Sequence, residues 1–384
     1  MTDDAGNSDL SRYFSTPLSR RQFLARGALV LSVPALAGTF LAACGSSSPT
    51  SAASASPSVA ATPVGQAVIS NFPGWIGPHE VTDFHKQFPT ASVYMNTSMP
   101  STIAGTVELI KNNPGAYDAA LGDLPTLGQM KAAGVYQKPD WAALPNISNV
   151  DATYRADYPD AVPNDYGFGV IGYRKDIVTE PVTSWADFWK LATTKYSGKV
   201  TVEDLDRATL GIALKYLGKS ANSTSAAELD QASKALITLK PHLLAAESVN
   251  VSTGLAKGEI VMAHCYNYDV AVAQQSSKNI GWVVPEEGTV GYVEGFIPIA
   301  GAKHLDTAYA FLNFHLDPKV YATFVNASGS SWVESAADPY IAAGLRASAA
   351  LKPTTAQLAK VEWTQFVGEA TALWGTAWAQ FKAA

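Results

Sequence analysis

Short apolar runs alternate with segments of helical spacing from about residue 67 to the end of the chain. The strand-like runs cover 67–72, 91–95, 117–121, 170–173, 199–202, 260–264 and 280–284. Apolar residues recur at helical spacing over 81–88, 101–111, 124–133, 308–316 and 363–381, and a capping box formed by Ser225 and Glu228 precedes another helix. This alternation predicts an α/β fold with mostly parallel sheets covered by helices on both faces. In such sheets ligands bind at the carboxyl ends of the strands.

The first 66 residues have a different pattern. The segment Ser19-Arg20-Arg21-Gln22-Phe23-Leu24 has the form of a twin-arginine export motif, and 27–43 is apolar without a charged residue. Cys44 follows Leu41-Ala42-Ala43 and precedes Gly45, which is the small-residue setting of a lipoprotein cleavage site. Residues 1–43 are therefore predicted to be a signal peptide, after whose removal Cys44 carries lipid. A chance arginine pair before a buried helix would not explain the cysteine that ends the apolar run.

Residues 45–66 are small or polar and carry neither a charge nor an aromatic ring. Such a segment buries too little apolar surface to offset its ordering entropy, so 44–66 is predicted to be a flexible tether reaching roughly 25–30 Å. The folded body of 67–384 is then expected to work outside the cytoplasm, in a periplasmic or cell-surface position. The lipid on Cys44 would hold it at the membrane.

Charge and cysteine content narrow the class of protein. Residues 1–43 hold three acids and four arginines, so the remainder has 23 basic and 30 acidic side chains and a net charge near −7. Nucleic-acid binding is disfavoured, because phosphate contacts need a basic surface and no Lys/Arg cluster is present. Apart from Cys44 the only cysteine is Cys265, so no intramolecular disulfide is expected, and its apolar setting predicts a buried small hydrophobe.

A search for catalytic motifs finds none. His79 and His85 are separated by six residues, whereas a helical zinc site needs a separation of four. The sequence contains no GxxxxGK[ST] phosphate loop, no GxSxG elbow and no SxxK pair. The prediction is therefore a protein that is not an enzyme and that needs no metal and no cofactor.

A resemblance to a known family rests on the segment Thr183-Ser184-Trp185-Ala186-Asp187-Phe188-Trp189-Lys190. It resembles the "TSWADLW" segment of bacterial polyamine-binding proteins, the spermidine/putrescine receptors of ABC importers. Further matches follow in the same order at 117–118, 137–138, 213–218, 258–260, 285–288, 310–314, 362–363 and 367–368. The resemblance implies a monomeric receptor that captures a small cationic solute and delivers it to an ABC permease in the membrane.

The same resemblance implies the architecture. The family has the two-lobe, periplasmic-binding-protein-like (type II) α/β fold, in which the ligand is held in a cleft between the lobes. One lobe would comprise 67–169 and 293–337, and the other 171–288 and 341–384. The chain would cross between the lobes near Val170, at 289–292 and at 338–340.

The family's pocket combines aromatic faces, which attract ammonium groups, with carboxylates that accept their hydrogen bonds. By resemblance, the first aromatic pair falls on Phe72 and Trp75, and a later aromatic residue falls on Tyr266. An aromatic residue and an acid near the second crossing fall on Tyr292 and Glu294. Packing in the core is the alternative for each aromatic residue. Glu294 lies in an otherwise apolar stretch, where a charge is expected to be paired or functional.

Several positions depart from the family pattern. Asp123 takes the place of a serine and adds a carboxylate, although it could equally be the N-cap of the following helix. Two family acids fall on Leu205 and Ala208, for which Asp204 or Asp206 could substitute. A late tyrosine is lost, but Trp332 lies close to its position. The solute is therefore predicted to be a polyamine or another cationic organic molecule.

Two alternatives stay open at this point. Tyr266, Tyr268 and His264 could bind ferric iron, because phenolate and imidazole suit such metals. A secreted enzyme on the same scaffold is the second alternative, since a fold does not fix a function.

Overall fold

The computed structural model of the chain describes residues 62–100 and 102–384. The predicted signal peptide, Cys44 and nearly all of the tether lie outside these residues. Within the described part of the chain, no helix is both long enough and apolar enough to cross a membrane.

Seven strands follow the predicted apolar runs, and four further strands lie at 243–246, 289–298, 331–332 and 361–363. They are β1 (Gly65–Ser70), β2 (Ala91–Asn96), β3 (Ala119–Asp123), β4 (Val162–Arg174), β5 (Val200–Val202), β6 (Leu243–Ala246), β7 (Met262–Tyr266), β8 (Ile280–Val283), β9 (Thr289–Pro298), β10 (Ser331–Trp332) and β11 (Val361–Trp363). Along the sheet the order is β2-β1-β3-β9-β4-β7-β5-β6, with β10 and β8 paired to β4 and β11 paired to β9.

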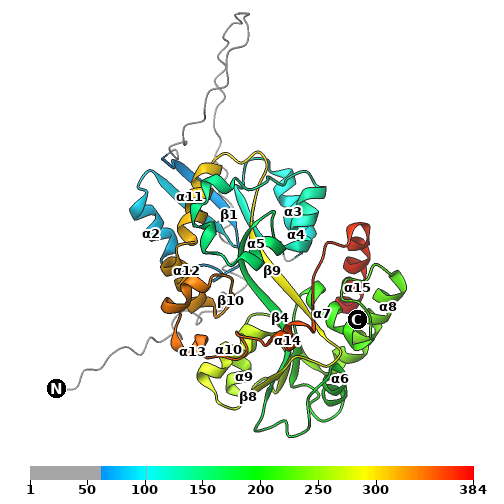
Figure 1. The fold of residues 1–384 in the computed structure, drawn as a ribbon. Helices are drawn as coiled ribbons and strands as arrows, with labels where there is room; N and C mark the ends of the chain where they lie inside the picture. The colour runs from blue at the N-terminus through cyan, green and yellow to red at the C-terminus, as the bar shows by residue number, and fades with distance from the viewer. Residues whose placement is uncertain (1–61, 101) are drawn as a thin grey trace, which may run out of the picture. The chain divides into compact units, whose positions relative to one another are not determined.

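Helices pack on both halves of this sheet (Figure 1). They are α2 (Glu80–Gln87), α3 (Ile103–Asn112), α4 (Leu124–Ala132), α5 (Ala152–Asp157), α6 (Trp185–Thr193), α7 (Asp206–Tyr216), α8 (Ala226–Leu239), α9 (Val251–Lys257), α10 (Asn267–Ser276), α11 (Leu305–His315), α12 (Pro318–Ser328), α13 (Ala343–Arg346), α14 (Thr355–Leu358) and α15 (Thr371–Ala383). The helices α2, α4 and α11 contact β1–β3, whereas α9 and α10 contact the half that contains β7. The α/β fold predicted from the sequence is confirmed.

The expectation of mostly parallel strands is wrong. The outer pairs β1–β2, β1–β3, β5–β6 and β5–β7 are parallel, as helix-connected strands must be. At the centre of the sheet, however, β9 runs antiparallel to both β3 and β4, and β4 runs antiparallel to β7. The two central strands therefore reverse the direction of the sheet, which makes it mixed.

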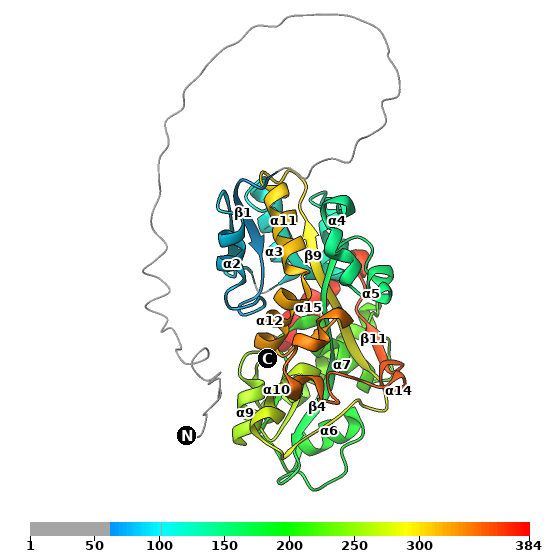
Figure 2. The same cartoon turned by 60° about the vertical axis from the view of Figure 1, so that its left-hand side comes forward.

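The strands β4 and β9 connect the two halves of the sheet (Figures 1 and 2). The first part of β4, through Phe168, pairs with β9, and its second part, from Gly169, pairs with β7. The strand is longer than the predicted run 170–173, because its first part contains Pro163, Asn164 and Asp165, which do not look like a strand in sequence. The lobe boundaries implied by the resemblance stay a prediction.

Two further predictions need correction. The C-terminal segment 363–381 is not one helix: Trp363 ends β11, and α15 begins only at Thr371, after Gly368 at a left-handed φ of 57°.

The predicted capping box of Ser225 and Glu228 is half formed. The Ser225 hydroxyl accepts from the Glu228 backbone N–H as predicted, but the Glu228 carboxylate binds the Ser223 hydroxyl at 2.5 Å.

Candidate functional site

Three carboxylates form a row across three neighbouring strands. In the pairing of β3 with β9, Asp123 lies opposite Glu294, and in the pairing of β9 with β4, Asp165 lies opposite the same Glu294. Directly opposed residues of antiparallel strands project from the same face, with Cβ atoms roughly 4.5–5.5 Å apart. The sheet therefore places these three acids side by side.

The burial of the three acids and their proximity to one another change their pKa values. Burial raises the pKa of Glu294 well above its usual range, and the charges of Asp165 and Asp123 raise it further. Burial also raises the pKa of Asp165 to about 6, despite the hydrogen bonds that its carboxylate accepts. The pKa of Asp123 is raised by burial as well, with an opposing effect from its hydrogen bonds to Thr126. A cation placed here would relieve the repulsion within the row.

The three acids differ in how far their oxygens are already engaged. Asp165 is fully buried, and its carboxylate accepts from Trp75 Nε1 at 3.2 Å, Asn164 Nδ2 at 2.7 Å and Ser330 Oγ at 2.8 Å. Asp123 is the N-cap of α4 and accepts from the Thr126 backbone N–H at 3.0 Å and its hydroxyl at 2.7 Å. The Glu294 carboxylate is partly exposed and has no hydrogen-bond partner among the described residues. It is the acid of the row that is free to bind a ligand.

Aromatic rings in mutual contact lie beside the row. Trp75 meets Tyr268 edge-on with ring centroids 5.3 Å apart, Tyr268 stacks on Tyr266 at 5.5 Å, and Tyr266 meets Tyr292 edge-on at 5.1 Å. The Tyr292 ring crosses β4 at Gly167, where an added Cβ would lie 2.6 Å from the ring. Glycine is therefore needed at this position for the close approach of the ring to the strand.

Two of the predicted site residues, Phe72 and Trp332, form no ring contact with this aromatic group among the described residues. Phe72 is half exposed and has no aromatic contact among the described residues. Trp332 lies opposite Asp165 in the pairing of β10 with β4, but its indole N–H donates to Asp338 at 2.7 Å and Lys352 lies over its ring. The structure brings together Trp75, Asp123, Tyr266, Tyr292 and Glu294. The assignment of all seven residues to the ligand site stays a prediction.

The start of α7 supplies further charges. Of the two substitutes proposed for the lost family acids, Asp204 is exposed and paired with Lys382 at 2.6 Å, whereas Asp206 acts electrostatically on Asp123. Arg207, which the sequence analysis did not single out, also faces Asp123 and lowers the pKa of that carboxyl. Its guanidinium lies 4.0 Å from the centroid of the Trp374 ring. Asp206 is therefore the better placed of the two acids.

A second carboxylate pair was missed by the sequence analysis. Glu203 at the end of β5 is 1% exposed, and its Oε1 has no hydrogen-bond partner within the described residues. Burial and the charge of Asp269 raise the pKa of Glu203 well above its usual range, and burial raises the pKa of Asp269 to about 7. Both charges also act on Tyr266, as do those of Glu294 and Asp123. Two groups of acids therefore act on Tyr266. The only sequence signal for Glu203 was its position as an acid directly after an apolar strand.

The ferric-iron alternative finds little support in the geometry. His264 is fully buried, packs edge-on against Trp185 with centroids 5.5 Å apart, and has its pKa lowered to about 3 by burial. No group of three or more His, Cys, Asp or Glu side chains within 62–100 and 102–384 is arranged to hold a metal ion. Cys265 is buried, as predicted.

Two surface hollows lie away from these acids. One, of about 340 Å³, is lined by residues of β6, by Lys240 and by Phe381 and Lys382 near the end of α15. The other, of about 140 Å³, lies between α8 and α15. Neither contains any of the carboxylates or aromatic residues described above.

Comparison with known proteins places the chain in a family. The model of the family described as bacterial extracellular solute-binding protein matches residues 81–343, and the chain belongs to this family. The spermidine/putrescine-binding periplasmic protein of Salmonella typhimurium is 27% identical over 321 residues, which cover 82% of this chain and 90% of that protein. The resemblance to polyamine-binding proteins stated above is thereby confirmed.

Solved structures show the same fold. A Listeria monocytogenes protein assigned to a spermidine/putrescine ABC transporter has a TM-score of 0.75 at 21% identity, with 83% of this chain and 98% of that chain covered. The TpPotD lipoprotein of Treponema pallidum has a TM-score of 0.67 at 22% identity, with 83% and 99% covered. The two-lobe, periplasmic-binding-protein-like type II fold predicted from the sequence is therefore confirmed.

Proposed function

We propose that this chain is the lipid-anchored receptor of an ABC importer, which captures a small cationic organic solute of the polyamine type and delivers it to a membrane permease. In this role it performs no reaction on the solute. The proposal goes beyond membership of the solute-binding family in three respects: the ligand class, the anchor and the permease.

The observation that carries the ligand class is the state of Glu294. Its carboxylate has two like-charged neighbours in the row, Asp165 and Asp123, and no hydrogen-bond partner among the described residues. A ligand ammonium group would supply the missing counter-ion and charge-assisted hydrogen bonds. The faces of Tyr266 and Tyr292 would line the adjoining methylene chain.

A second group of acids favours an organic cation over a single small ion. The charges of Glu203 and Asp269 act on Tyr266, as do those of Glu294 and Asp123. An amine with more than one ammonium group lying along the Tyr266 ring would offset more of this negative charge than a single small ion. The Salmonella relative is named for the binding of spermidine and putrescine, which supports the same ligand class.

The anchor and the permease rest on different support. The segment around Cys44 has the form of a lipoprotein signal, and the Treponema protein with the same fold is described as a lipoprotein. Support for the permease comes from the Listeria protein, which is described as belonging to a spermidine/putrescine ABC transporter.

The test of the ligand class starts with a thermal-shift screen of the chain against amines, amino acids, sugars and ferric salts. Titration calorimetry with putrescine and spermidine then gives the affinities, and mass spectrometry of the recovered amine tests whether it is chemically unchanged. We expect amines to stabilise the protein and to be recovered intact. Stabilisation by ferric salts or sugars alone would overturn the ligand class, and a modified amine would overturn the receptor role.

A further inference from the structure

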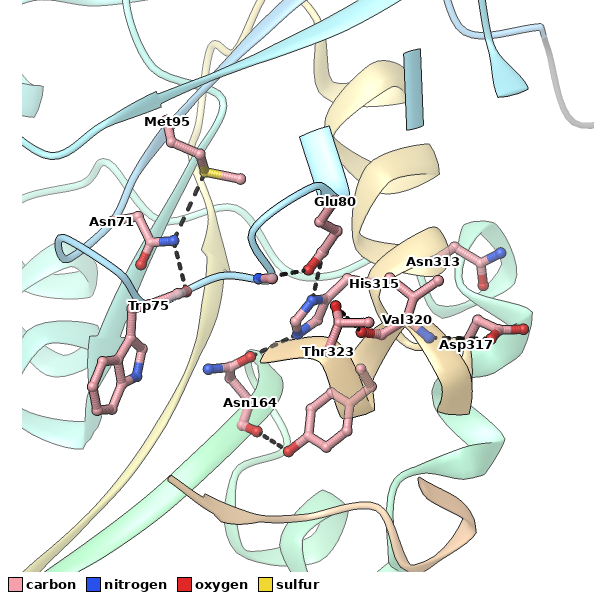
Figure 3. A network of polar contacts seen from close by, with 12 residues as sticks. Asn71, Trp75, Glu80, Met95, Asn164, Asn313, His315, Asp317, Val320 and Thr323 are labelled. Carbon is pink, nitrogen blue, oxygen red and sulfur yellow. Dashed lines mark hydrogen bonds and ion pairs between the residues drawn. The ribbon is translucent and has the colours of Figure 1, made fainter. Parts of the chain in front are cut away.

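A buried chain of hydrogen bonds leads from Glu80 of α2 through His315 to Asn164 (Figure 3), and Asn164 continues it to Asp165 of the carboxylate row. His315 Nδ1 lies 2.7 Å from Glu80 Oε1, and His315 Nε2 lies 2.8 Å from Asn164 Oδ1. Asn164 Nδ2 in turn donates to Asp165 Oδ1 at 2.7 Å. The side chains of His315 and Glu80 are 1% and 0% exposed, and Asn164 is fully buried. Solvent therefore contributes no partner to these bonds.

The partners of Asn164 decide which way its amide points. Asp165 Oδ1 also accepts from the indole N–H of Trp75, which can only donate. Because Asp165 Oδ1 acts as an acceptor toward Trp75, the group of Asn164 that faces it is the NH₂ donor. The amide oxygen of Asn164 is thereby turned toward His315.

The partners of His315 then decide its protonation. Its Nε2 faces the amide oxygen of Asn164, and its Nδ1 faces a carboxylate oxygen of Glu80, so both ring nitrogens face acceptors. The second oxygen of Glu80 accepts the Gly77 backbone N–H at 3.1 Å. The amide oxygen of Asn164 can only accept, so Nε2 carries a proton, whether the proton between Nδ1 and Glu80 belongs to the ring or to the carboxyl group.

We propose that His315 acts as a positioning residue for the candidate ligand site. Its Nε2–H fixes the Asn164 amide, the amide fixes Asp165, and Asp165 holds the indole of Trp75. Glu80, from α2, holds the other ring nitrogen. The relevance of Trp75 to ligand binding rests on the proposed function, whereas the protonation of His315 does not.

The surroundings of the ring fit this assignment. The titratable or charged groups that face it are Glu80 from α2 and Tyr321 from α12, and Asp165 lies one residue beyond Asn164 on β4. The aromatic rings of Phe296, Tyr321 and Phe324 have centroids 5.6, 5.4 and 5.8 Å from that of His315. These rings surround the imidazole with apolar surface, and Glu80 and Asn164 are its hydrogen-bond partners among the described residues.

The same chain ties down the loop that carries Trp75. Trp75 is bound to Asp165 through its indole, and Gly77, two residues later, is bound to Glu80 through its backbone N–H. An added Cβ at Gly77 would lie 2.2 Å from Thr323 Oγ1, so only glycine lets the backbone approach this closely. Both ends of the segment 75–77 are thus bound to the same hydrogen-bond network, in which His315 links Glu80 to Asn164.

The first measurement concerns protonation and uses no ligand. In the full chain labelled with ¹⁵N-histidine at pH 7.5, we expect His315 to carry a slowly exchanging proton on Nε2. The signal is assigned in the wild-type protein by through-space contacts to the rings of Tyr321 and Phe324. A His315 ring without a proton on Nε2 would overturn the proposal, even if no variant folds.

The second measurement compares Glu80→Gln with Asp83→Asn, an exposed acid on the same helix that pairs with Lys86 at 2.8 Å. Glu80→Gln should shift the ¹⁵N signal of His315 Nδ1 and the emission of Trp75, the latter isolated by subtracting the Trp75→Phe spectrum. It should also weaken amine binding about fivefold or more, the equivalent of one lost hydrogen bond. Asp83→Asn should change none of these. An unchanged Trp75 emission in Glu80→Gln would overturn the positioning role, whereas a wild-type protein that binds no amine would overturn only the proposed function.

Discussion

Asp123 and Glu294 lie directly opposite one another on the antiparallel strands β3 and β9, although 170 positions separate them in the sequence. Two carboxylates in this relationship repel each other when both are ionised. The pair is therefore the place where a bound cation gains most, and the two acids are the most direct targets for mutation.

Glu294→Gln should weaken the binding of putrescine or spermidine by roughly 30-fold or more, because breaking a buried charge pair costs on the order of 2–5 kcal/mol. The glutamine keeps the shape of the side chain and removes its charge. Titration calorimetry measures the effect, with Glu259→Gln, an exposed acid between α9 and β7, as the matched control. If the wild type binds an amine and Glu294→Gln binds it equally well, the site assignment is wrong.

Asp123→Asn should reduce amine affinity less than Glu294→Gln, because the Asp123 carboxylate is already engaged by Thr126. Asparagine still accepts from the Thr126 backbone N–H, so stability should change little. Asp123→Ala removes the helix cap and should lower the free energy of unfolding by about 1 kcal/mol. Urea unfolding distinguishes the two variants, and equal stability of both would argue against the capping role.

The buried acids predict how stability depends on pH. Burial raises the pKa of Asp165 to about 6 in the folded state, above the value of about 3.9 in the unfolded chain. The folded state therefore binds more protons in this range, and the free energy of unfolding falls as the pH rises from about 4 to 6. The loss from this group is on the order of 3 kcal/mol.

Unfolding of the ligand-free protein at a series of pH values checks this expectation, with Asp165→Asn for comparison. The slope of the unfolding free energy between pH 4 and 6 should become shallower in Asp165→Asn, whatever the absolute stability of that variant. Equal slopes in the two proteins would show that Asp165 does not titrate as described.

Cys44→Ser should release the protein from membranes and leave the fold intact, since the predicted tether contributes nothing to the core. Cell fractionation followed by immunoblotting measures the release. Replacement of Arg20-Arg21 by Lys-Lys should block export if the twin-arginine route is used. Recovery of Cys44→Ser wholly in the membrane fraction would refute the lipid anchor.

A two-lobe receptor is expected to close on its ligand by a hinge. Saturating amine should therefore reduce the radius of gyration in small-angle scattering. It should also change tryptophan emission through Trp75 or Trp332. Scattering that is the same with and without saturating ligand would argue against closure.

The sequence alone was sufficient to single out Glu294 as a candidate site residue, because an acid within the apolar stretch Tyr292–Ile297 is conspicuous without any structure. It was insufficient for Asp165, because the residues around it include proline and glycine, which disfavour strands in sequence and are tolerated here beside a bulge. Local pattern predicted most single elements, since apolar periodicity is a local property.

The row of acids could not be predicted, because it depends on the pairing of three strands that are far apart in the chain. Helix-connected strands favour parallel pairing, and that expectation gave the wrong neighbours for β4 and β9. The role of His315 was equally inaccessible. Its partners Glu80 and Asn164 lie 235 and 151 positions away in the sequence.

The irregular pairing between β4 and β9 has a consequence for chain length. Pro163 pairs with Gly295 and Asp165 pairs with Glu294, so Asn164 is an extra residue with no partner on β9. If Asn164 were deleted, these two pairings would become consecutive and the ladder would be regular. The sheet itself therefore does not require this position. A lineage of this protein could lose that one codon and keep its strands in register, while the side-chain link from His315 to Asp165 would disappear.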